Sequence, residues 1–283
     1  MSIAASSSPG NQPLAGSGSE RRRPGLHVAG QATDRCLGRL QSLYRQDRSS
    51  AVAALALLRR CIGKEVHEAP ESWGNDGLEE LATVRAERRS AAEDEWARER
   101  GTFASAESGG PSERRELAEE RAVFLAITLW SVHQQSVRDA NMHARGWGLG
   151  RSVRQLARAR LPQPEQQSTP RSRPGSGTAS DLEVGEALRK RFVRVGTSAS
   201  FDMLGIRLRE LVLLFRDARV PLDYALLADQ VCTWQDVARQ AEVRRAWGRD
   251  FHLAAQRGNS GGEGRDDDSG DGIGTDDDIT TED

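Results

Sequence analysis

The chain has 283 residues, of which 37% are hydrophobic and 29% are charged, and its mean hydropathy is −0.63. This length allows two domains of ordinary size, but the composition indicates that a good part of the chain lies outside any core. Aromatic residues make up only 5%, and Ala and Leu supply most of the apolar residues, which argues against an all-β fold and favours helices.

Cysteine usage and hydropathy exclude several classes of protein. The three cysteines form no Cys-x-x-Cys pair, so a disulfide framework and a cysteine zinc site are not expected. The three arginines at 21–23 are followed by Pro-Gly and not by the apolar run of an export signal. The most apolar windows, 51–58 and 122–130, are about half of the roughly 20 residues that cross a bilayer. We therefore expect a soluble, cytoplasmic protein with no membrane partner.

Charge is distributed unevenly along the chain. Residues 258–283 contain ten acids and one base, residues 31–144 carry a net charge of −3, and residues 145–257 carry +8. Only Lys64 and Lys190 are lysines among the 40 basic residues, and guanidinium groups match phosphate oxygens well. A GC-rich genome explains the excess of arginine equally well, so the clustering is the better indication of a polyanionic partner.

The first half of the chain predicts a Ser/Gly/Pro-rich disordered tail over 1–30 and a helical domain over 31–160. A helix over 51–62 is expected to be capped by Ser50 and stopped by Gly63. The Glu/Arg-rich run over 79–100 predicts a solvated helix with few core contacts, within an irregular charged insertion at about 80–111. A longer helix should open at Ser112 and place Leu117, Phe124 and Ile127 inward.

The second half begins with a Pro-rich linker over 161–180, followed by a C-terminal helical bundle over 181–257 and an acidic disordered tail over 258–283. Apolar stripes at spacings of three, four and seven predict its helices; they include Leu188 with Val195, and Val243 with Trp247. The predicted fold class is therefore all-α, with two small helical bundle domains and disordered N- and C-terminal tails.

No residue pattern indicates catalysis, a cofactor or a metal. The five histidines are scattered, and His133 on an apolar helix is interpreted as structural. Asp223 and Asp229 are interpreted as helix caps or as partners of arginines, and Trp234 and Trp247 as core residues. The acidic tail matches a calcium loop poorly and is interpreted as a solvated tail that can also act as an intramolecular mimic of nucleic acid.

Basic side chains on successive predicted helices form the one group of residues that points to a ligand. Lys190, Arg191 and Arg194 share one predicted helix, Arg207 and Arg209 lie on the next, and the last helix adds arginines at 244, 245 and 249. Rows of basic side chains on neighbouring helices suit a polyanion that is bound through its phosphates. The sequence shows no pattern of residues that would read bases. The alternative interpretation is that these arginines only keep the surface soluble.

Several segments, in this order, resemble the CasB family, the small subunit of the type I-E CRISPR Cascade complex. They are Ala56-Leu57-Leu58-Arg59-Arg60, Trp73, the run 124–133 (FLAITLWSVH), 149–156 (LGRSVRQL), Arg189-Lys190-Arg191-Phe192, 208–212 (LRELV), 220–224 (VPLDY), Leu227-Ala228-Asp229, Trp234, and Val243 through Trp247 to Phe251. The resemblance covers about residues 35–253 without 80–111 and 162–180. The family often has Glu where this chain has Arg189.

The resemblance implies a non-catalytic, all-α protein that works within Cascade. Its implied partners are the backbone and large subunits, the crRNA, the target and non-target DNA strands, and a second copy of itself. The implied function is to bind crRNA-guided DNA through phosphate contacts and to stabilise the R-loop in antiviral defence. By position, the residues that match basic sites of the family are Arg59, Arg60, Arg151, Lys190, Arg191, Arg194, Arg207 and Arg209.

Of two other functions, only the first is compatible with the residues alone. One is a stand-alone helical protein that binds nucleic acid or serves as a scaffold. The other, a metal-dependent nuclease, would need an acidic cluster in the folded part, and the sequence shows none there.

Overall fold

The computed structural model describes residues 25–68, 76–99, 113–160 and 179–259, which form helices joined by short connections and no strand within these ranges. The helices are α1 (Val28–Arg45), α2 (Ser49–Arg60), α3 (Asp76–Glu99), α4 (Glu113–Gln134), α5 (Leu149–Ala159), α6 (Ala179–Gly196), α7 (Phe201–Asp217), α8 (Tyr224–Trp234), the short 3-10 helix η2 (Val237–Arg239) and α9 (Gln240–Asn259). The all-α prediction is confirmed for these residues. Residues 1–24, Trp73, residues 100–112, residues 161–178 and residues 260–283 lie outside them. The predicted end of the first tail at residue 30 is wrong, because α1 already begins at Val28 and buries Val28, Ala29 and Gly30.

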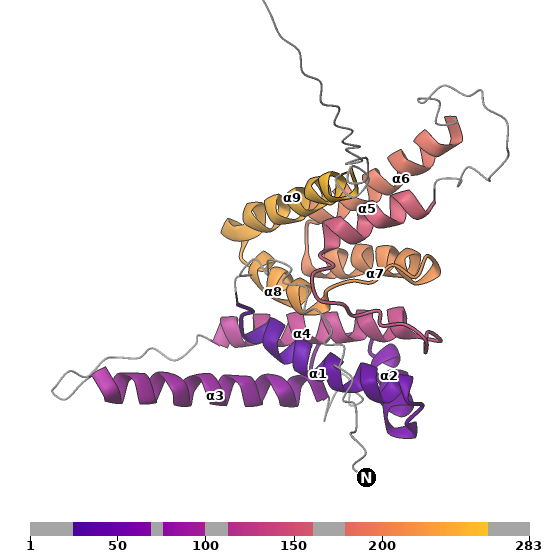
Figure 1. Cartoon of the computed structure of the whole chain (residues 1–283). Coiled ribbons are helices and arrows are strands. Elements are labelled where there is room, and N and C mark those ends of the chain that lie inside the picture. Colours follow the sequence, from indigo (N-terminus) through magenta and orange to yellow (C-terminus); the bar gives the residue numbers. More distant parts are fainter. Residues whose placement is uncertain (1–24, 69–75, 100–112, 161–178, 260–283) are drawn as a thin grey trace, which may run out of the picture.

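The helices form a stack in which α4 and α8 occupy the middle (Figure 1). α1, α2 and α3 lie on one side of this middle layer, and α5, α6 and α9 lie at the opposite end, with α7 between them and α4 (Figure 1). Close packing joins α1 to α8, α4 to α7 and α8, and α5 to α9.

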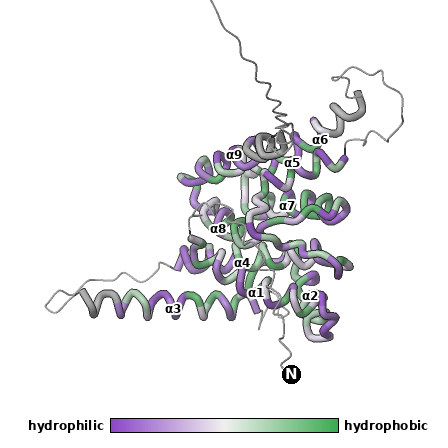
Figure 2. Tube along the Cα trace, in the orientation of Figure 1, coloured by the Kyte–Doolittle hydropathy of each residue, from purple (hydrophilic) through white to green (hydrophobic). Residues whose placement is uncertain are grey.

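α4 is central because its second half is mostly apolar and is buried on every side. Every residue from 122 to 134 except Leu125 is buried, so this segment has no solvent-facing side. Such a helix has to be enclosed by neighbours, whereas an amphipathic helix covers a core with one face only. The neighbouring helices show that amphipathic pattern, with hydrophobic and hydrophilic residues alternating along their traces (Figure 2).

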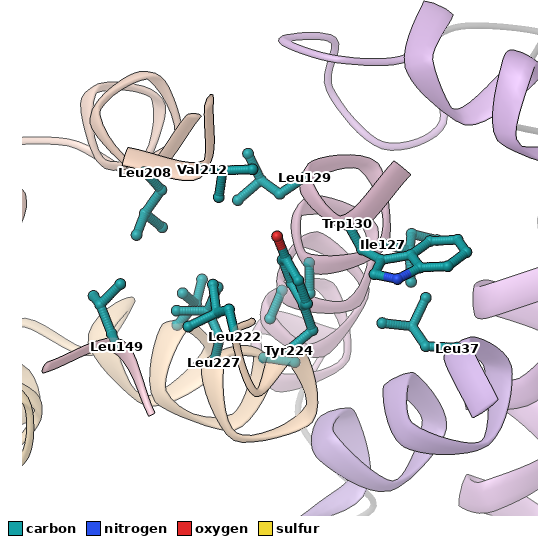
Figure 3. Close-up of a cluster of buried hydrophobic side chains, with 14 of the residues drawn as sticks. Leu37, Ile127, Leu129, Trp130, Leu149, Leu208, Val212, Leu222, Tyr224 and Leu227 are labelled. Atoms are coloured by element: carbon teal, nitrogen blue, oxygen red, sulfur yellow. The ribbon is translucent and has the colours of Figure 1, made fainter. Parts of the chain in front are cut away.

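The core runs through the whole stack. Leu37 of α1 and Ile127 and Trp130 of α4 pack at one end, and Tyr224 of α8 connects them to the side chains of α7 and α5 (Figure 3). Buried residues from 31–160 and from 181–257 therefore belong to one hydrophobic cluster. The division of the chain into two domains stays a prediction.

Aspartate side chains cap helices, as the sequence indicated for Asp223. Asp223 precedes α8 and accepts hydrogen bonds from the backbone nitrogens of Leu226 (3.1 Å) and Gly146 (2.6 Å). Asp250 of α9 accepts one from the backbone nitrogen of Arg151 (2.8 Å) in the first turn of α5. The bonds from Leu226 and Arg151 satisfy backbone donors that a helix start leaves without an intrahelical partner.

Two further local predictions about the first half are wrong. Ser50 does not cap α2, because the helix already begins at Ser49 and its N-cap, Arg48, makes no side-chain cap hydrogen bond. Leu117 is not a core residue: its exposed fraction is 46%, because it lines an open cleft beside Val237 of η2 instead of packing into the core. Phe124 and Ile127 are buried as predicted.

The prediction of a solvated charged helix is confirmed for α3. Leu81 and Val84 are buried, whereas every described side chain from 86 to 94 is exposed. Ion pairs between arginine and glutamate attach the helix to its neighbours. Arg35 of α1 binds Glu87 at 2.7 Å, and Arg85 binds Glu119 of α4 at 2.9 Å.

Candidate nucleic-acid interface

The cationic side of α6 follows from its apolar stripe. Leu188 and Val195 are buried, so the intervening Lys190, Arg191 and Arg194 are left exposed. Lys190 lies 3.9 Å from Glu186 one turn earlier, and Arg189 binds the same carboxylate at 3.2 Å. Within the described residues Arg191 and Arg194 form no ion pair.

α9 repeats this arrangement. Val243 and Trp247 are buried, and Trp247 Nε1 donates a hydrogen bond to Gln230 Oε1 at 2.7 Å, which confirms that it is a core residue. The stripe leaves three exposed arginines on the outer sides of the helix, Arg244, Arg245 and Arg249.

The acidic residues of α9 are engaged elsewhere. Glu242 binds Arg239 at 3.1 Å, and Asp250 caps α5. None of the three arginines Arg244, Arg245 and Arg249 pairs with an acid among residues whose side chains are described. The guanidinium charge of this helix is therefore not neutralised within the described chain.

Side chains of α6 and α9 meet, so the two sets of arginines lie on neighbouring helices. The rings of Phe192 and Phe251 stack with their centroids 5.6 Å apart. At the other end of the contact, Gly196 leaves room for the aliphatic part of Arg244. Five exposed arginines of these two helices form no ion pair in the described chain, and we refer to them as the α6–α9 arginine surface; they are Arg191, Arg194, Arg244, Arg245 and Arg249.

Arg207 of α7 belongs to the same region but has a different environment. It is half-buried, and its Nη1 donates hydrogen bonds to the carbonyl oxygen of Arg194 and to Ser198 Oγ, the latter at 3.2 Å. A carbonyl in the last turn of a helix lacks an intrahelical donor, and Arg207 supplies one. The contacts therefore indicate that Arg207 positions the end of α6.

Arg151 is likewise in contact with the protein. Its guanidinium lies 4.1 Å from the ring centroid of Trp147, and Nη1 donates a hydrogen bond to the Gly146 carbonyl at 3.1 Å. Arg154, one turn further along α5, lies 5.5 Å from the Phe251 ring and so adjoins the α6–α9 arginine surface. Sequence reasoning missed Arg154, although its spacing of three from Arg151 could have drawn attention to it.

Arg59, Arg60 and Arg209 lie in a different part of the molecule. The first two end α2, where Arg59 is half-buried and Arg60 exposed. Arg209 lines a cleft of about 630 Å³ between α4, α7 and the segment that follows α2, together with the apolar side chains of Phe124 and Ile206. The eight predicted residues therefore do not form one site, and their contact with nucleic acid stays a prediction.

The titratable groups of the core have structural environments. His133 is buried and its Nδ1 lies 2.9 Å from the Tyr224 hydroxyl, while its Nε2 has no partner among the described residues. Burial lowers the pKa of His133 to about 3, and it raises the pKa of the Cys36 thiol to about 12 and that of Cys232 to about 11. These residues are therefore neutral near pH 7.

The described ranges contain neither a metal-ligand cluster nor a membrane-spanning helix. No group of three or more His, Cys, Asp or Glu side chains there could hold a metal ion. No described helix is long and apolar enough to span a membrane.

Comparisons with known proteins identify the family. The model of the family "CRISPR-associated protein Cse2" matches residues 54–252. A solved structure, "Crystal structure of CasB from Thermobifida fusca", is similar to this chain with 33% sequence identity and a TM-score of 0.56, and the match covers 81% of this chain and 99% of that one. The search of curated proteins found no match. The chain therefore belongs to the Cse2 (CasB) family of CRISPR-associated proteins, and this membership supports its place as a subunit of a CRISPR Cascade complex.

Proposed function

We propose that the protein is a non-catalytic subunit of a type I-E Cascade complex that holds crRNA-guided DNA by its phosphates and thereby stabilises the R-loop. The observation that carries the proposal is the α6–α9 arginine surface. Its five guanidinium groups are exposed and lack acidic partners in the described chain, and α6 and α9 are in contact through Phe192 and Phe251.

The chemistry of this surface suits a backbone and not a base sequence. Guanidinium groups donate paired hydrogen bonds to phosphate oxygens and keep their charge at all physiological pH values. Each phosphate that they neutralise releases counterions, so binding should weaken steeply with salt. In guide-directed recognition the RNA selects the sequence by pairing, and the protein needs only to retain the strands.

The proposed partners are the backbone and large subunits, the crRNA, the two DNA strands and a second copy of this chain, and the proposed compartment is the cytoplasm. Arg59, Arg60 and Arg209 lie away from α6 and α9, so they would contact a different partner or a different stretch of nucleic acid. Arg151 and Arg207 would act mainly by positioning α5 and α6, because their guanidinium groups already bind backbone carbonyls.

Paired substitutions in the assembled complex test the proposal. Arg191→Gln with Arg194→Gln, and Arg245→Gln with Arg249→Gln, should each weaken retention of target DNA by about tenfold near 0.1 M salt and should lower the slope of log K against log salt by about 1.5 to 2. Retention is measured by following a labelled target duplex bound to the crRNA-loaded complex over a salt series.

The control removes the same charge elsewhere. Arg48→Gln with Arg89→Gln changes two exposed arginines of the α2 and α3 region, at the opposite end of the stack from α6 and α9 (Figure 1). It should leave retention and the salt slope unchanged. If the α6 and α9 variants assemble normally and retain DNA like the unmodified complex, the arginine surface is not the contact and the proposal fails.

A further inference from the structure

The chain carries its own polyanion directly beyond the helix that bears most of the α6–α9 arginine surface. Residues 260–283 follow the end of α9 at Asn259 and contain ten acids and one base, with two runs of three aspartates at 266–268 and 276–278. The family model ends at residue 252, so this segment lies beyond the part matched to the family.

The connection is short enough for these acids to lie back along α9. Arg249 is ten residues before Asn259, which is about 15 Å along a helix, and Arg245 is about 21 Å away. Asp266 is seven residues after Asn259, and an extended chain of that length spans about 24 Å. The second aspartate run has a longer reach and could extend to Arg191 and Arg194 on α6.

The charges also match. The exposed arginines of the surface lack acidic partners in the described chain, whereas residues 260–283 hold a large excess of acids. A tethered segment meets its binding surface at an effective concentration in the millimolar range, so weak individual contacts are sufficient for occupancy.

We propose that residues 260–283 dock on the α6–α9 arginine surface when nucleic acid is absent and that a nucleic-acid backbone displaces them. The segment then competes with nucleic acid for the surface. It suppresses weak, non-specific binding of nucleic acid more strongly than it suppresses binding of a strand that other parts of the complex also hold. This proposal rests on the proposed function for the displacement step, whereas the docking step can be measured without nucleic acid.

The first experiment measures competition with the full-length chain. A tail-neutral variant carries Asp→Asn substitutions at 266–268, 271 and 276–278 and Glu→Gln substitutions at 263 and 282, which leaves Asp283 to balance Arg265. It should bind a fluorescent single-stranded DNA of mixed sequence about tenfold more tightly than the unmodified chain at about 50 mM salt, and the two should converge near 0.5 M because screening weakens both contacts. Equal affinity at low salt would overturn the proposal.

The second experiment measures docking alone. A labelled synthetic peptide with the sequence of residues 260–283 should bind the tail-neutral chain, and the affinity should fall at least tenfold when Arg245→Gln and Arg249→Gln are added. The Arg48→Gln, Arg89→Gln pair should leave peptide binding unchanged. Absence of peptide binding, or equal binding by all three proteins, would overturn docking on this surface.

The two experiments separate the failure of this proposal from that of the proposed function. If the chain binds DNA but the tail-neutral variant and the peptide show no effect, the competitor is rejected and the phosphate-binding surface stands. If the peptide docks as expected and neither form of the chain binds DNA, the docking stands while the displacement step and the proposed function fail.

Discussion

The carboxylate of Asp229 in α8 caps the start of α1 at Gly30. Asp229 Oδ1 accepts a hydrogen bond from the Gly30 backbone nitrogen at 2.6 Å, and Oδ2 accepts one from the His27 nitrogen at 2.7 Å. Burial raises the pKa of Asp229, and the two backbone hydrogen bonds offset part of this rise. The bond joins residues that are 199 positions apart, so the first and eighth helices depend on each other.

Gly30→Ala should destabilise the protein by about 2–3 kcal/mol, because a small-to-large change in a closely packed site forces its neighbours apart. A Cβ at position 30 would lie 2.5 Å from Asp229 Oδ2 and 2.8 Å from the carbonyl oxygen of Ala225. Urea unfolding followed by circular dichroism measures the change. Gly38→Ala in the same helix is the control: nothing lies within 4 Å of its added Cβ, so it should stabilise by about 0.5–1 kcal/mol. Equal effects of both substitutions would reject the close contact at Gly30.

Asp34 should make stability depend on acid pH. The hydrogen bond from His143 lowers its pKa, the Arg145 guanidinium lowers it further, and partial burial raises it in opposition. Because the pKa is lower in the folded state, the stabilisation is present above the unfolded value of about 3.8 and is lost as the pH falls below it. Asp34→Asn should therefore cost about 1–2 kcal/mol at pH 7, and its difference from the unmodified protein should shrink steadily below about pH 4.

The matched control for Asp34 is Asp139→Asn, which breaks the exposed pair with Arg219. Exposed ion pairs contribute little, so its effect at pH 7 should be smaller. Unfolding curves at pH 7, 4 and 3 test both. A cost for Asp34→Asn that is the same at every pH would show that the ion pair is not its source.

His133 should oppose folding in mild acid. Burial lowers its pKa from 6.5 to about 3, so the folded state binds fewer protons than the unfolded state between these values, and stability falls as the pH decreases through this window. The expected loss from this residue is about 1.4 kcal/mol per pH unit below about pH 6.

A double substitution isolates the effect of His133. His133→Leu with Tyr224→Phe removes both polar partners of the 2.9 Å contact, so no buried group is left unpaired there. Between pH 6 and 4 this variant should lose less stability than the unmodified protein, whereas His252→Gln, at an exposed histidine, should follow the unmodified curve. Parallel pH profiles of the double variant and the unmodified chain would contradict the assignment.

Substitution of Arg207 should affect folding stability, whereas substitution of the exposed arginines should affect DNA retention. Arg207→Gln removes the donor to the Arg194 carbonyl and to Ser198, so it should lower the unfolding free energy by about 1 kcal/mol. Arg191→Gln with Arg194→Gln should leave stability within about 0.5 kcal/mol, because both side chains are exposed. The salt slope of DNA retention should show the reverse order, and a larger drop in slope for Arg207→Gln would mean that it contacts phosphate itself.

The features that the sequence predicted correctly are local ones. Leu188 and Val195 on α6, and Val243 and Trp247 on α9, stand at helical spacing, and each pair is buried. The helical period is set by backbone geometry, so a stripe of apolar residues identifies the face that is buried whatever covers it. The capping role of Asp223 could be anticipated for the same reason, since its partner Leu226 is three residues away.

The sequence alone therefore determined the all-α class, the buried faces and the uneven distribution of charge. Only the tertiary structure decided that Leu117 stays exposed, that Asp229 caps a helix 199 residues away, and that Arg207 binds the end of α6 while Arg191 and Arg194 reach solvent. These outcomes depend on which helix lies opposite each side chain. Periodicity within one helix carries no information about its neighbours, because long-range contacts are selected by the packing of the whole core.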